Sequence, residues 1–338
     1  MVRRPEPNLI RWGIIGPGRI AEEFVRALDA VGSASLYGVA SRDKARAEKF
    51  ASDYGASVYY DSYQALIEDP RVDAIYIATP HRFHYEQARN CILGGKPVLC
   101  EKPLTVNAVE ARELIGLAQT SGVFLMEAMR TRYLPIYQQL RHWLDEGKIG
   151  AVSGVTSSFG FKFPRDPEDR LLNHELAGGA LLDLGVYNLS MSQWLFAEPA
   201  ESFSVQGLLG DTRVDEHDEI TLVYPGARTS VFCISMTTEL DNELTIYGDG
   251  GRITVHPMFW NATQATLSVN NGLSAKDETR TVRREFFATG MEYEIEEAVR
   301  CIQDGLTESS RMPLSDTLDT MMLMDQLRSA MGLAYDFE

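Results

Sequence analysis

Short apolar runs alternate with amphipathic segments from residue 10 to about residue 130. This alternation is typical of βαβ units, in which helical crossovers join parallel strands. The expected strands are residues 11–15, 35–41, 57–60, 73–79, 97–101 and 123–128. The expected helices are residues 19–30, 43–53, 62–68, 84–94 and 107–121, with Ser62 as the N-cap of the third and Asn107 as the N-cap of the fifth. The pattern predicts an α/β domain with a doubly wound parallel sheet over residues 1–130.

Longer runs typical of antiparallel strands replace this pattern after residue 150. They cover residues 151–159, 218–224, 228–238, 242–248 and 251–256. Turn signals lie at Pro225-Gly226, at residues 248–251 and at Asn270-Asn271-Gly272. Helices are expected over 292–304 and 315–331, the second with a methionine-rich stripe that we assign to core packing. Residues 131–338 are thus predicted to form an α+β domain with an open, mostly antiparallel sheet, whose last helix can pack back on the first domain.

The charge and the cysteines restrict the partners and the compartment. Against 48 acidic residues there are 32 Lys and Arg, a net charge of −16 that repels phosphate backbones and anionic lipid. We therefore expect no nucleic-acid or membrane partner. The four cysteines form no C-x-x-C pair, so neither a metal site nor a disulfide framework is predicted. No apolar run has the length of a membrane span and no signal peptide is indicated, so a cytoplasmic location is expected.

A glycine-rich turn follows the first apolar run. It reads Gly16-Pro17-Gly18-Arg19-Ile20-Ala21 and opens the first helix. In this G-x-G-x-x-A pattern the first glycine permits a tight turn and the second lets the backbone approach a pyrophosphate, which the free N–H groups of the helix then bind. At the first strand–helix junction of a parallel sheet, the pattern predicts a dinucleotide site.

Cofactor choice is indicated at the end of the second strand. Sites specific for NAD usually offer a carboxylate to the adenosine ribose there. This chain offers the Ser41 hydroxyl and the Arg42 guanidinium, which suit a 2′-phosphate, and Arg46 lies one turn further on. We therefore expect NADP. The alternative is that Arg42 is a solvated residue and Asp43 binds the ribose, which would make NAD a cofactor as well.

Polar residues also end the fourth and fifth strands. The fourth ends in Ala78-Thr79-Pro80, followed by His81 and His84, and such residues commonly line the cofactor crevice. For each of the two histidines, a role in the site and a position on the helix surface are equally expected. The fifth ends in Glu101-Lys102-Pro103, where Lys102 is expected to face the crevice because an ammonium cannot lie in an apolar core. The alternative is an exposed ion pair between Glu101 and Lys102.

A second polar pair lies in the predicted α+β domain. Asp183 and Tyr187 follow Gly178-Gly179-Ala180 and are four residues apart, so they are expected on one face of a helix. Alone, such a pair would more often be a surface pair. Together with Lys102, it forms a candidate set for proton transfer.

These motifs resemble those of the Gfo/Idh/MocA oxidoreductases, in the branch of dimeric trans-dihydrodiol dehydrogenase and NADP-dependent D-xylose 1-dehydrogenase. The resemblance covers nearly the whole chain and rests on GPGRIA, YIATPHRFHYE, CEKPLTVNAVEA, MEAMRTRYLP and GGALLDLGVYNLS. It implies a Rossmann domain followed by an open sheet that often forms a dimer, so we expect a homodimer or homotetramer through that sheet. It also implies that Lys102, Asp183 and Tyr187 are the catalytic set.

The implied roles agree with general chemistry. Oxidation of a carbinol needs a base for the hydroxyl proton. A tyrosine has an ordinary pKa of about 10 and is a poor base at neutral pH unless an ammonium stabilises its phenolate. We expect Lys102 to do this for Tyr187, while Asp183 orients substrate hydroxyls.

One departure from the branch bears on the substrate. Where the dihydrodiol dehydrogenases typically read E-A-x-W-T-R, this chain has Arg130 in place of the aromatic residue, with Arg132 two positions later. A guanidinium suits a polyhydroxylated substrate better than an aromatic diol. We therefore expect an NADP-dependent dehydrogenase of an aldose or cyclic polyol, with Arg130 and Arg132 among the substrate-binding residues. The alternatives are a trans-dihydrodiol dehydrogenase or dicarbonyl reductase, and a non-catalytic NADP-binding sensor.

Overall fold

The computed structural model describes residues 9–270 and 278–338 and divides them into two units. The first contains the chain up to Ala128 together with Phe287–Thr317, and the second contains Met129–Phe286 together with Leu318–Glu338. The division departs from the predicted domains 1–130 and 131–338, because a late segment of the chain returns to the first unit.

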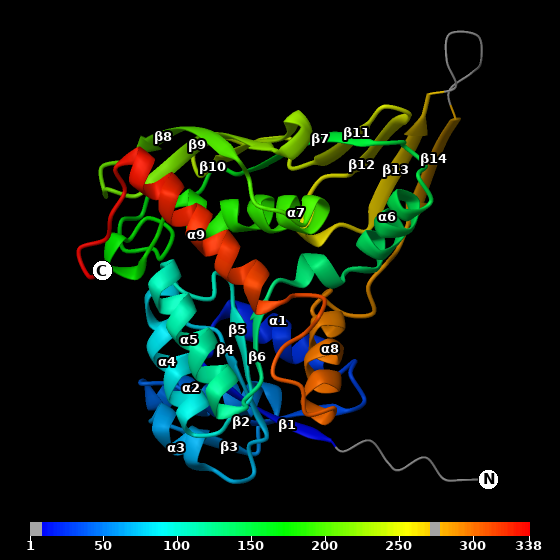
Figure 1. Ribbon diagram of the computed structural model, residues 1–338. Helices are drawn as coiled ribbons and strands as arrows, with labels where there is room; N and C mark the ends of the chain where they lie inside the picture. Colours follow the sequence, from blue (N-terminus) through cyan, green and yellow to red (C-terminus); the bar gives the residue numbers. More distant parts are fainter. Residues whose placement is uncertain (1–8, 271–277) are drawn as a thin grey trace, which may run out of the picture. The chain divides into compact units, whose positions relative to one another are not determined.

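The first unit has the predicted parallel sheet (Figure 1). Its strands are β1 Ile10–Ile15, β2 Ala34–Ala40, β3 Val58–Tyr60, β4 Ala74–Ile77, β5 Val98–Glu101 and β6 Leu125–Ala128. Their order is β3-β2-β1-β4-β5-β6, and all neighbours are parallel. The direction of winding changes between β1 and β4. In open α/β sheets, ligands bind beyond the carboxyl ends of the strands at such a switch point.

Five helices join these strands, as predicted. They are α1 Arg19–Leu28, α2 Lys44–Tyr54, α3 Tyr63–Glu68, α4 His84–Leu93 and α5 Ala108–Ser121. Side chains cap three of them, since Asp43, Ser62 and Asn107 each accept a hydrogen bond from an amide in the first turn. The two predicted N-caps are therefore confirmed. A 3₁₀ turn, His81–Phe83, leads into α4.

Helix α8, Glu292–Gln303, belongs to the first unit, whereas the sequence analysis placed it in the second domain. The Thr289 hydroxyl donates to the Glu23 carbonyl of α1 at 3.3 Å. The Leu125 amide of β6 donates to the Thr307 carbonyl at 3.0 Å, so the returning segment extends the hydrogen bonding of the edge strand. These contacts join residues more than 180 positions apart, a separation at which local patterns carry no information.

The second unit is built on the predicted open sheet. Its strands are β7 Val152–Gly160, β8 Ser202–Leu209, β9 Asp215–Tyr224, β10 Arg228–Ser235, β11 Leu244–Gly248, β12 Gly251–Val255, β13 Gln264–Val269 and β14 Glu278–Arg283. The order is β14-β13-β12-β11-β7-β10-β9-β8, and only the β7–β10 pair is parallel. Strands β8, β13 and β14 were not predicted from the sequence. The turn predicted at Asn270-Asn271-Gly272 lies partly outside the described residues.

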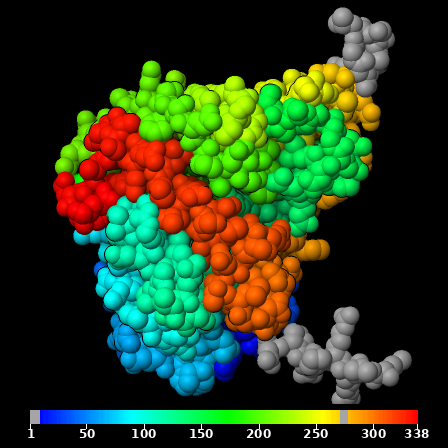
Figure 2. Space-filling view, viewed as in Figure 1, coloured from blue at the N-terminus to red at the C-terminus, as the bar shows by residue number. Residues whose placement is uncertain are grey.

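Helices of the second unit are α6 Pro135–Asp145, α7 Val186–Phe196 and most of α9, Leu314–Met331. Short 3₁₀ turns occupy Arg130–Tyr133, His174–Leu176, Pro225–Ala227 and Phe259–Asn261, and a π-turn occupies Leu181–Gly185. The red end of α9 lies against the green surface of this unit in Figure 2, where Met331 packs on Gly207 of β8. None of the helices in the described residues is long and apolar enough to span a bilayer.

Candidate functional site

The glycine turn lies at the switch point of the parallel sheet. Gly16 follows β1 with φ +91°, a backbone conformation that favours glycine. A Cβ atom at Gly16 would lie 2.7 Å from Thr79 Cγ2, so the turn packs directly on the end of β4. A Cβ atom at Gly18 would meet no atom within 4 Å. Gly18 also starts α1 without a side-chain cap, which leaves the first amides of this helix available to an anion.

The remaining residues of this motif have the exposure that a ligand would need. Arg19 is exposed, while Gly18 and Ile20 are half-buried. Backbone that is open beside a helix N-terminus accepts a pyrophosphate without steric conflict. The turn predicted from the sequence therefore fits a dinucleotide.

The residues at the end of β2 bear on the choice between NADP, bound through Arg42, and NAD, bound through Asp43. The Asp43 carboxylate accepts hydrogen bonds from the amides of Ala45 and Arg46 at 2.9 and 3.3 Å, so it caps α2. The Arg42 side chain is exposed, and its guanidinium lies 5.2 Å from the centre of the Phe83 ring. Ser41 is buried, and its hydroxyl accepts from the Asp43 amide at 3.2 Å. Asp43 is thus engaged as a helix cap through Oδ1, and the exposed Arg42 stays the candidate contact of a 2′-phosphate.

Arg46 is tied to the glycine turn, since its guanidinium donates to the Pro17 carbonyl at 3.3 Å. The contact links the first turn of α2 to the strand–helix junction after β1. Arg46 thereby supports the position of that junction and brings a second positive charge to the same edge.

His84 connects the ends of β4 and β5. Its Nε2 atom lies 2.8 Å from the Thr79 carbonyl and its Nδ1 atom lies 2.8 Å from the Pro103 carbonyl. A neutral imidazole has a single N–H, so only one of these contacts is a hydrogen bond at a time. Burial lowers the pKa of His84 to about 4, and the neighbouring His81 contributes. The ring is fully buried, so the predicted cofactor contact of His84 is corrected to support of two loops that face the cofactor edge.

Lys102 follows β5 at the same edge of the sheet. It is half-buried and precedes Pro103, to which it is joined by a cis peptide bond. The adjacent Glu101 accepts a hydrogen bond of 2.5 Å from the Tyr76 hydroxyl, and the Tyr76 ring stacks on Phe24 at 3.8 Å between ring centres. Glu101 is therefore held against the protein interior. This arrangement favours the site interpretation of the Glu101-Lys102-Pro103 motif over an exposed loop.

Asp183 lies in the π-turn of the second unit. It is buried, and both of its carboxylate oxygens accept from the Arg170 guanidinium, at 2.9 and 3.4 Å. The sequence predicts both residues in one regular α-helix, whereas Asp183 lies in a π-turn and Tyr187 lies in the first turn of α7. The sequence analysis missed Arg170, which lies thirteen positions before Asp183 in a stretch without regular structure.

Tyr187 is buried at the start of α7, beside an aromatic cluster. Its ring centre lies 5.7 Å from that of Phe159, which stacks on Trp260 at 3.5 Å. Phe161 packs edge-on against Trp260, and Phe163 against Phe161. Aromatic residues alternate along the sequence at the end of β7, at Phe159, Phe161 and Phe163. This alternation could have indicated the cluster before the structure was known. The second unit thus has an aromatic cluster near Tyr187, in which Phe159 and Trp260 are buried and Phe161 and Phe163 are half-buried, although Arg130 replaces the expected aromatic residue.

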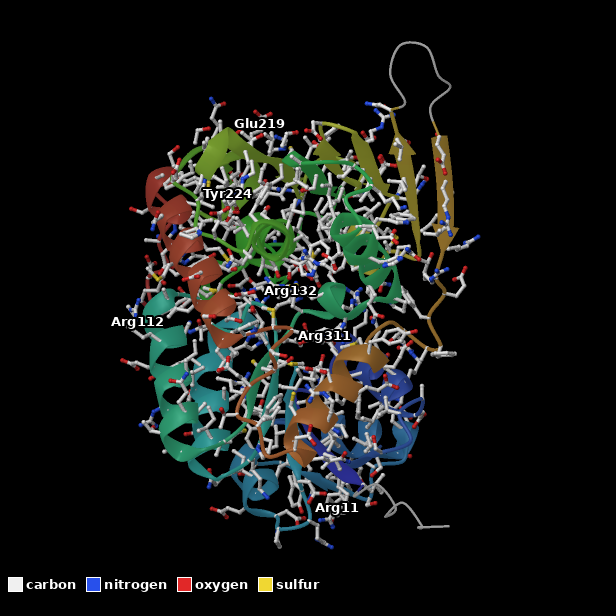
Figure 3. All side chains as sticks on the ribbon, turned by 45° about the vertical axis from the view of Figure 1, so that its right-hand side comes forward. Arg11, Arg112, Arg132, Glu219, Tyr224 and Arg311 are labelled. Carbon is white, nitrogen blue, oxygen red and sulfur yellow. The ribbon has the colours of Figure 1, made fainter. Side chains whose placement is uncertain are left out.

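Arg132 supports a helix of the second unit. It is buried within the second unit, and its guanidinium donates to the Ser190 hydroxyl at 3.0 Å and to the Ser190 carbonyl at 2.9 Å (labelled in Figure 3). These bonds hold α7, which carries Tyr187. The substrate contact predicted for Arg132 stays a prediction beside this supporting role. Arg130 is half-buried and stays a candidate substrate residue.

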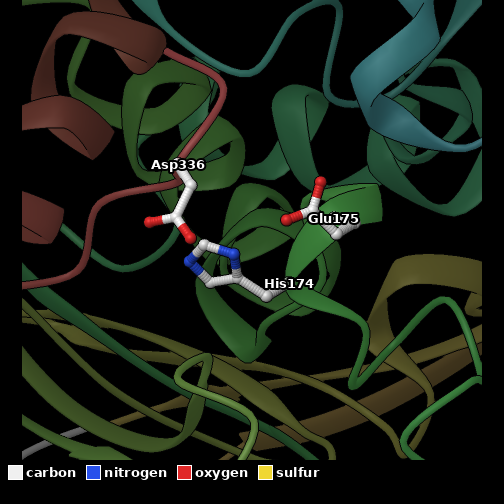
Figure 4. Close-up of side chains that lie close together, drawn as sticks. All are labelled: His174, Glu175 and Asp336. Atoms are coloured by element: carbon white, nitrogen blue, oxygen red, sulfur yellow. The ribbon is translucent and has the colours of Figure 1, made fainter.

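One group of potential metal ligands occurs among the described residues. His174, Glu175 and Asp336 place one ligand atom each within 4.8 Å of one another (Figure 4). The Arg213 guanidinium already pairs with Asp336 at 2.6 Å, and His174 Nε2 lies 2.9 Å from the Ala334 carbonyl. These contacts explain the arrangement, so we assign no metal to it.

The predicted residues are thus brought together in two groups. The glycine turn, Ser41-Arg42, the 78–80 segment and Lys102 share the carboxyl edge of the parallel sheet in the first unit. Asp183 lies in the π-turn directly before α7 and Tyr187 lies in the first turn of α7, both in the second unit. The meeting of Lys102 with Asp183 and Tyr187 stays a prediction.

Two family models match the chain. Residues 10–129 match the oxidoreductase family with an NAD-binding Rossmann fold, and residues 137–254 match the GFO/IDH/MocA C-terminal domain. Among curated relatives, the trans-1,2-dihydrobenzene-1,2-diol dehydrogenase of Xenopus tropicalis is 35% identical, over 96% of this chain and 99% of its own length. The enzyme of the same name from Homo sapiens is 32% identical, over 96% of this chain and 98% of its own length.

Solved structures agree with these matches. A 3-ketoreductase from Actinomadura kijaniata, in complex with NADP and TDP-benzene, superposes with a TM-score of 0.83 at 27% identity, over 96% of this chain and 98% of that one. The same enzyme has been solved with a lysine replaced by alanine and with a tyrosine replaced by phenylalanine. An aldose-aldose oxidoreductase from Caulobacter crescentus has a TM-score of 0.85 at 21% identity, over 96% and 98% of the two chains, and shares the fold.

Proposed function

The chain belongs to the Gfo/Idh/MocA oxidoreductase family, and from this premise we propose that it is an NADP-dependent dehydrogenase of a carbinol in an aldose or related cyclic polyol. One observation carries the proposal. The carboxyl edge of the parallel sheet presents an open glycine turn, an exposed arginine where NAD sites have a carboxylate, and a lysine. Edges of this kind bind dinucleotides and present them to a substrate.

NADP fits the residues at this edge. The turn around Gly16 and Gly18 and the start of α1 at Arg19 and Ile20 would hold the pyrophosphate. Ser41 and Arg42 would hold the 2′-phosphate, which a guanidinium binds with paired hydrogen bonds. The Ala78-Thr79-Pro80 segment and Glu101-Lys102 would border the nicotinamide half. When bound, the nicotinamide serves as the two-electron acceptor or donor of the reaction.

Lys102, Tyr187 and Asp183 are proposed as the catalytic residues. Tyr187 takes the hydroxyl proton of the carbinol as it is oxidised and returns it in the reverse direction. The Lys102 ammonium favours the phenolate and thereby lowers the cost of proton removal. Asp183, which Arg170 fixes with two hydrogen bonds, orients a neighbouring hydroxyl of the substrate. Arg130 contributes further donors to a polyhydroxylated substrate.

A second candidate function is oxidation of a trans-dihydrodiol. It is favoured by the aromatic cluster of Phe159, Phe161 and Trp260 beside Tyr187, which can pack on an apolar ring. It is also the activity in the names of the curated relatives. We rank it second because Arg130 replaces the aromatic residue typical of that branch.

A substrate panel tests the proposed function. Turnover of D-xylose, D-glucose and a trans-dihydrodiol would be measured with NADP and with NAD. We expect the highest kcat/KM for a sugar with NADP. A higher kcat/KM for the dihydrodiol would favour the second candidate. Tight NADPH binding without turnover of any substrate on a broad panel would indicate a cofactor-binding sensor and overturn the enzymatic proposal.

We further propose a cytoplasmic protein that forms a dimer or tetramer through the open sheet of its second unit. The four cysteines are all free, which suits a reducing compartment. Val231 on β10 and Tyr247 on β11 are exposed apolar side chains on neighbouring parts of that sheet, where an interface would cover them.

A further inference from the structure

Two carboxyl groups lie buried side by side in β9. Asp215 and Asp218 both have no exposed surface, and they lie on one face of the strand because their partners on β8 are Leu209 and Gly207, two positions apart. Each carboxyl group alters the pKa of the other. Asp215 Oδ2 accepts a 2.5 Å hydrogen bond from the Leu181 amide. In the described residues, its Oδ1 atom and both oxygens of Asp218 have no donor. As two carboxylates, these groups would be acceptors that face each other without a proton between them.

A single proton resolves this conflict. A protonated carboxyl donates one O–H hydrogen bond, so one proton converts the facing acceptors into a donor–acceptor pair and removes one buried charge. The Leu181 amide stabilises Asp215 as the carboxylate, and Asp218 is therefore the partner that retains the proton. We propose that Asp215 and Asp218 share one proton, and that this pair positions the 179–187 segment that carries Asp183 and Tyr187.

The positioning follows from where Asp215 is attached. Its bond to Leu181 fixes the first residue of the π-turn in which Asp183 lies. Gly179 packs on the same carboxylate, because a Cβ atom at this position would overlap with Asp215 Oδ1. With φ +126°, Gly179 also has a backbone conformation that favours glycine. The Asp215 carboxylate thus contacts Leu181, the first residue of the turn, and Gly179, two positions before it.

The surrounding elements offer few other charges to this pair. On α9, Arg328 attracts the Asp215 carboxylate, but its guanidinium is bonded to Asp325 and Glu338. The C-terminal segment contributes Tyr335, whose hydroxyl donates to the Gly178 carbonyl at 2.6 Å.

Across the sheet, the residues paired with Asp218 are uncharged, Gly207 on β8 and Ile234 on β10. Burial and the neighbouring Asp215 raise the pKa of the Asp218 carboxyl well above its ordinary value. A proton bound more tightly in the folded than in the unfolded state makes stability fall as pH rises above the unfolded pKa of about 3.9.

The shared proton is tested with Asp218→Asn, whose amide donates to Asp215 without titrating. Melting temperatures of this variant and the parent would be measured from pH 5 to pH 9. We expect the variant to melt progressively higher than the parent as pH rises. Glu219→Gln is the matched control, since Glu219 is exposed on the same strand (Figure 3). A constant difference between Asp218→Asn and parent over this range would overturn the shared proton.

The positioning role is tested with Asp215→Ala and Asp215→Asn. The alanine variant removes the acceptor of the Leu181 amide, whereas asparagine retains an oxygen there. We expect faster hydrogen exchange in residues 179–187 for alanine and nearly parental exchange for asparagine. Gly179→Ala displaces the same contact from the other side and is expected to act like Asp215→Ala. Parental exchange in both alanine variants would overturn the positioning role.

The effect on turnover rests on the proposed function. For Asp215→Ala we expect kcat to fall about 10- to 100-fold, as for a displaced catalytic group, with the KM for NADPH unchanged and kcat restored in Asp215→Asn. An unchanged kcat in an active Asp215→Ala enzyme would contradict the role. If the parent turned over no substrate, the proposed function would fail, whereas melting and exchange would still decide on the carboxyl pair.

Discussion

Arg42 is the residue on which cofactor choice depends. Its exposed guanidinium stands at the end of β2, while Asp43 is engaged as a helix cap. Losing a charged hydrogen bond costs about 1.5–3 kcal/mol, so Arg42→Ala should raise the KM for NADPH about 10- to 100-fold and leave that for NADH nearly unchanged. Arg89→Ala, which removes an exposed arginine of α4, is the control. Equal effects on the two nicotinamides would exclude Arg42 from the 2′-phosphate site.

His84 should make the stability of the protein depend on pH. Its folded pKa of about 4 lies below the ordinary 6.5, so the unfolded chain binds the proton more readily. Stability from His84 is complete above pH 6.5 and is lost as pH falls toward 4. Between pH 7 and pH 4 the parent should lose about 3 kcal/mol more than His84→Gln, because each pKa unit corresponds to about 1.4 kcal/mol. Urea unfolding at both pH values measures this, and equal losses would contradict it.

Among the secondary-structure elements, the start of α2 allows the capping role of Asp43 to be distinguished from a role in cofactor binding. Its carboxylate caps α2 through two amides. Asp43→Ala should therefore lower the free energy of unfolding by about 1 kcal/mol without changing the affinity for either nicotinamide. Asp43→Ser, which retains a capping oxygen, should restore most of this stability. A selective loss of NADH affinity in the alanine variant would indicate that Asp43 binds the adenosine ribose.

The parallel sheet could be predicted because its strands are apolar runs separated by amphipathic helices, three of which begin with a side-chain N-cap. Strand β4 is buried throughout, which agrees with the continuous apolar run in the sequence. Strands β8 and β14 could not be predicted in the same way, because most of their side chains are exposed and polar residues interrupt the pattern. Their pairing partners, and not their own hydrophobicity, determine that they are strands.

The candidate site was predictable where motifs are local. Gly16, Arg42 and Lys102 each follow a recognisable strand, so their common edge follows from the parallel topology. The contacts that fix Asp183 and its turn were not predictable, since Arg170 binds Asp183 from irregular structure and Asp215 accepts from the Leu181 amide across 34 positions. The burial of His84 and Arg132 was missed because a polar side chain in a motif looks the same whether it binds a ligand or the backbone.

At the scale of the whole molecule, the open sheet of the second unit is proposed to form the oligomer interface. Val231 and Tyr247 are 41% and 39% exposed. Burying a lysine in an apolar interface is costly, so Val231→Lys with Tyr247→Lys should shift the sedimentation coefficient toward that of the monomer. Leu93→Lys, an exposed apolar residue at the end of α4, is the control. An unchanged oligomer in the double variant would place the interface elsewhere.

Lys102 and Tyr187 are proposed to act together on one carbinol, although they belong to different units of the chain. A double-mutant cycle on kcat with Lys102→Ala and Tyr187→Phe tests it most directly. Each change should lower kcat by about 10²- to 10⁴-fold, as for loss of acid–base catalysis. Because residues that act as a unit are not additive, the double variant should be about as slow as the slower single variant. Effects that multiply, or single variants with parental kcat, would contradict the claim.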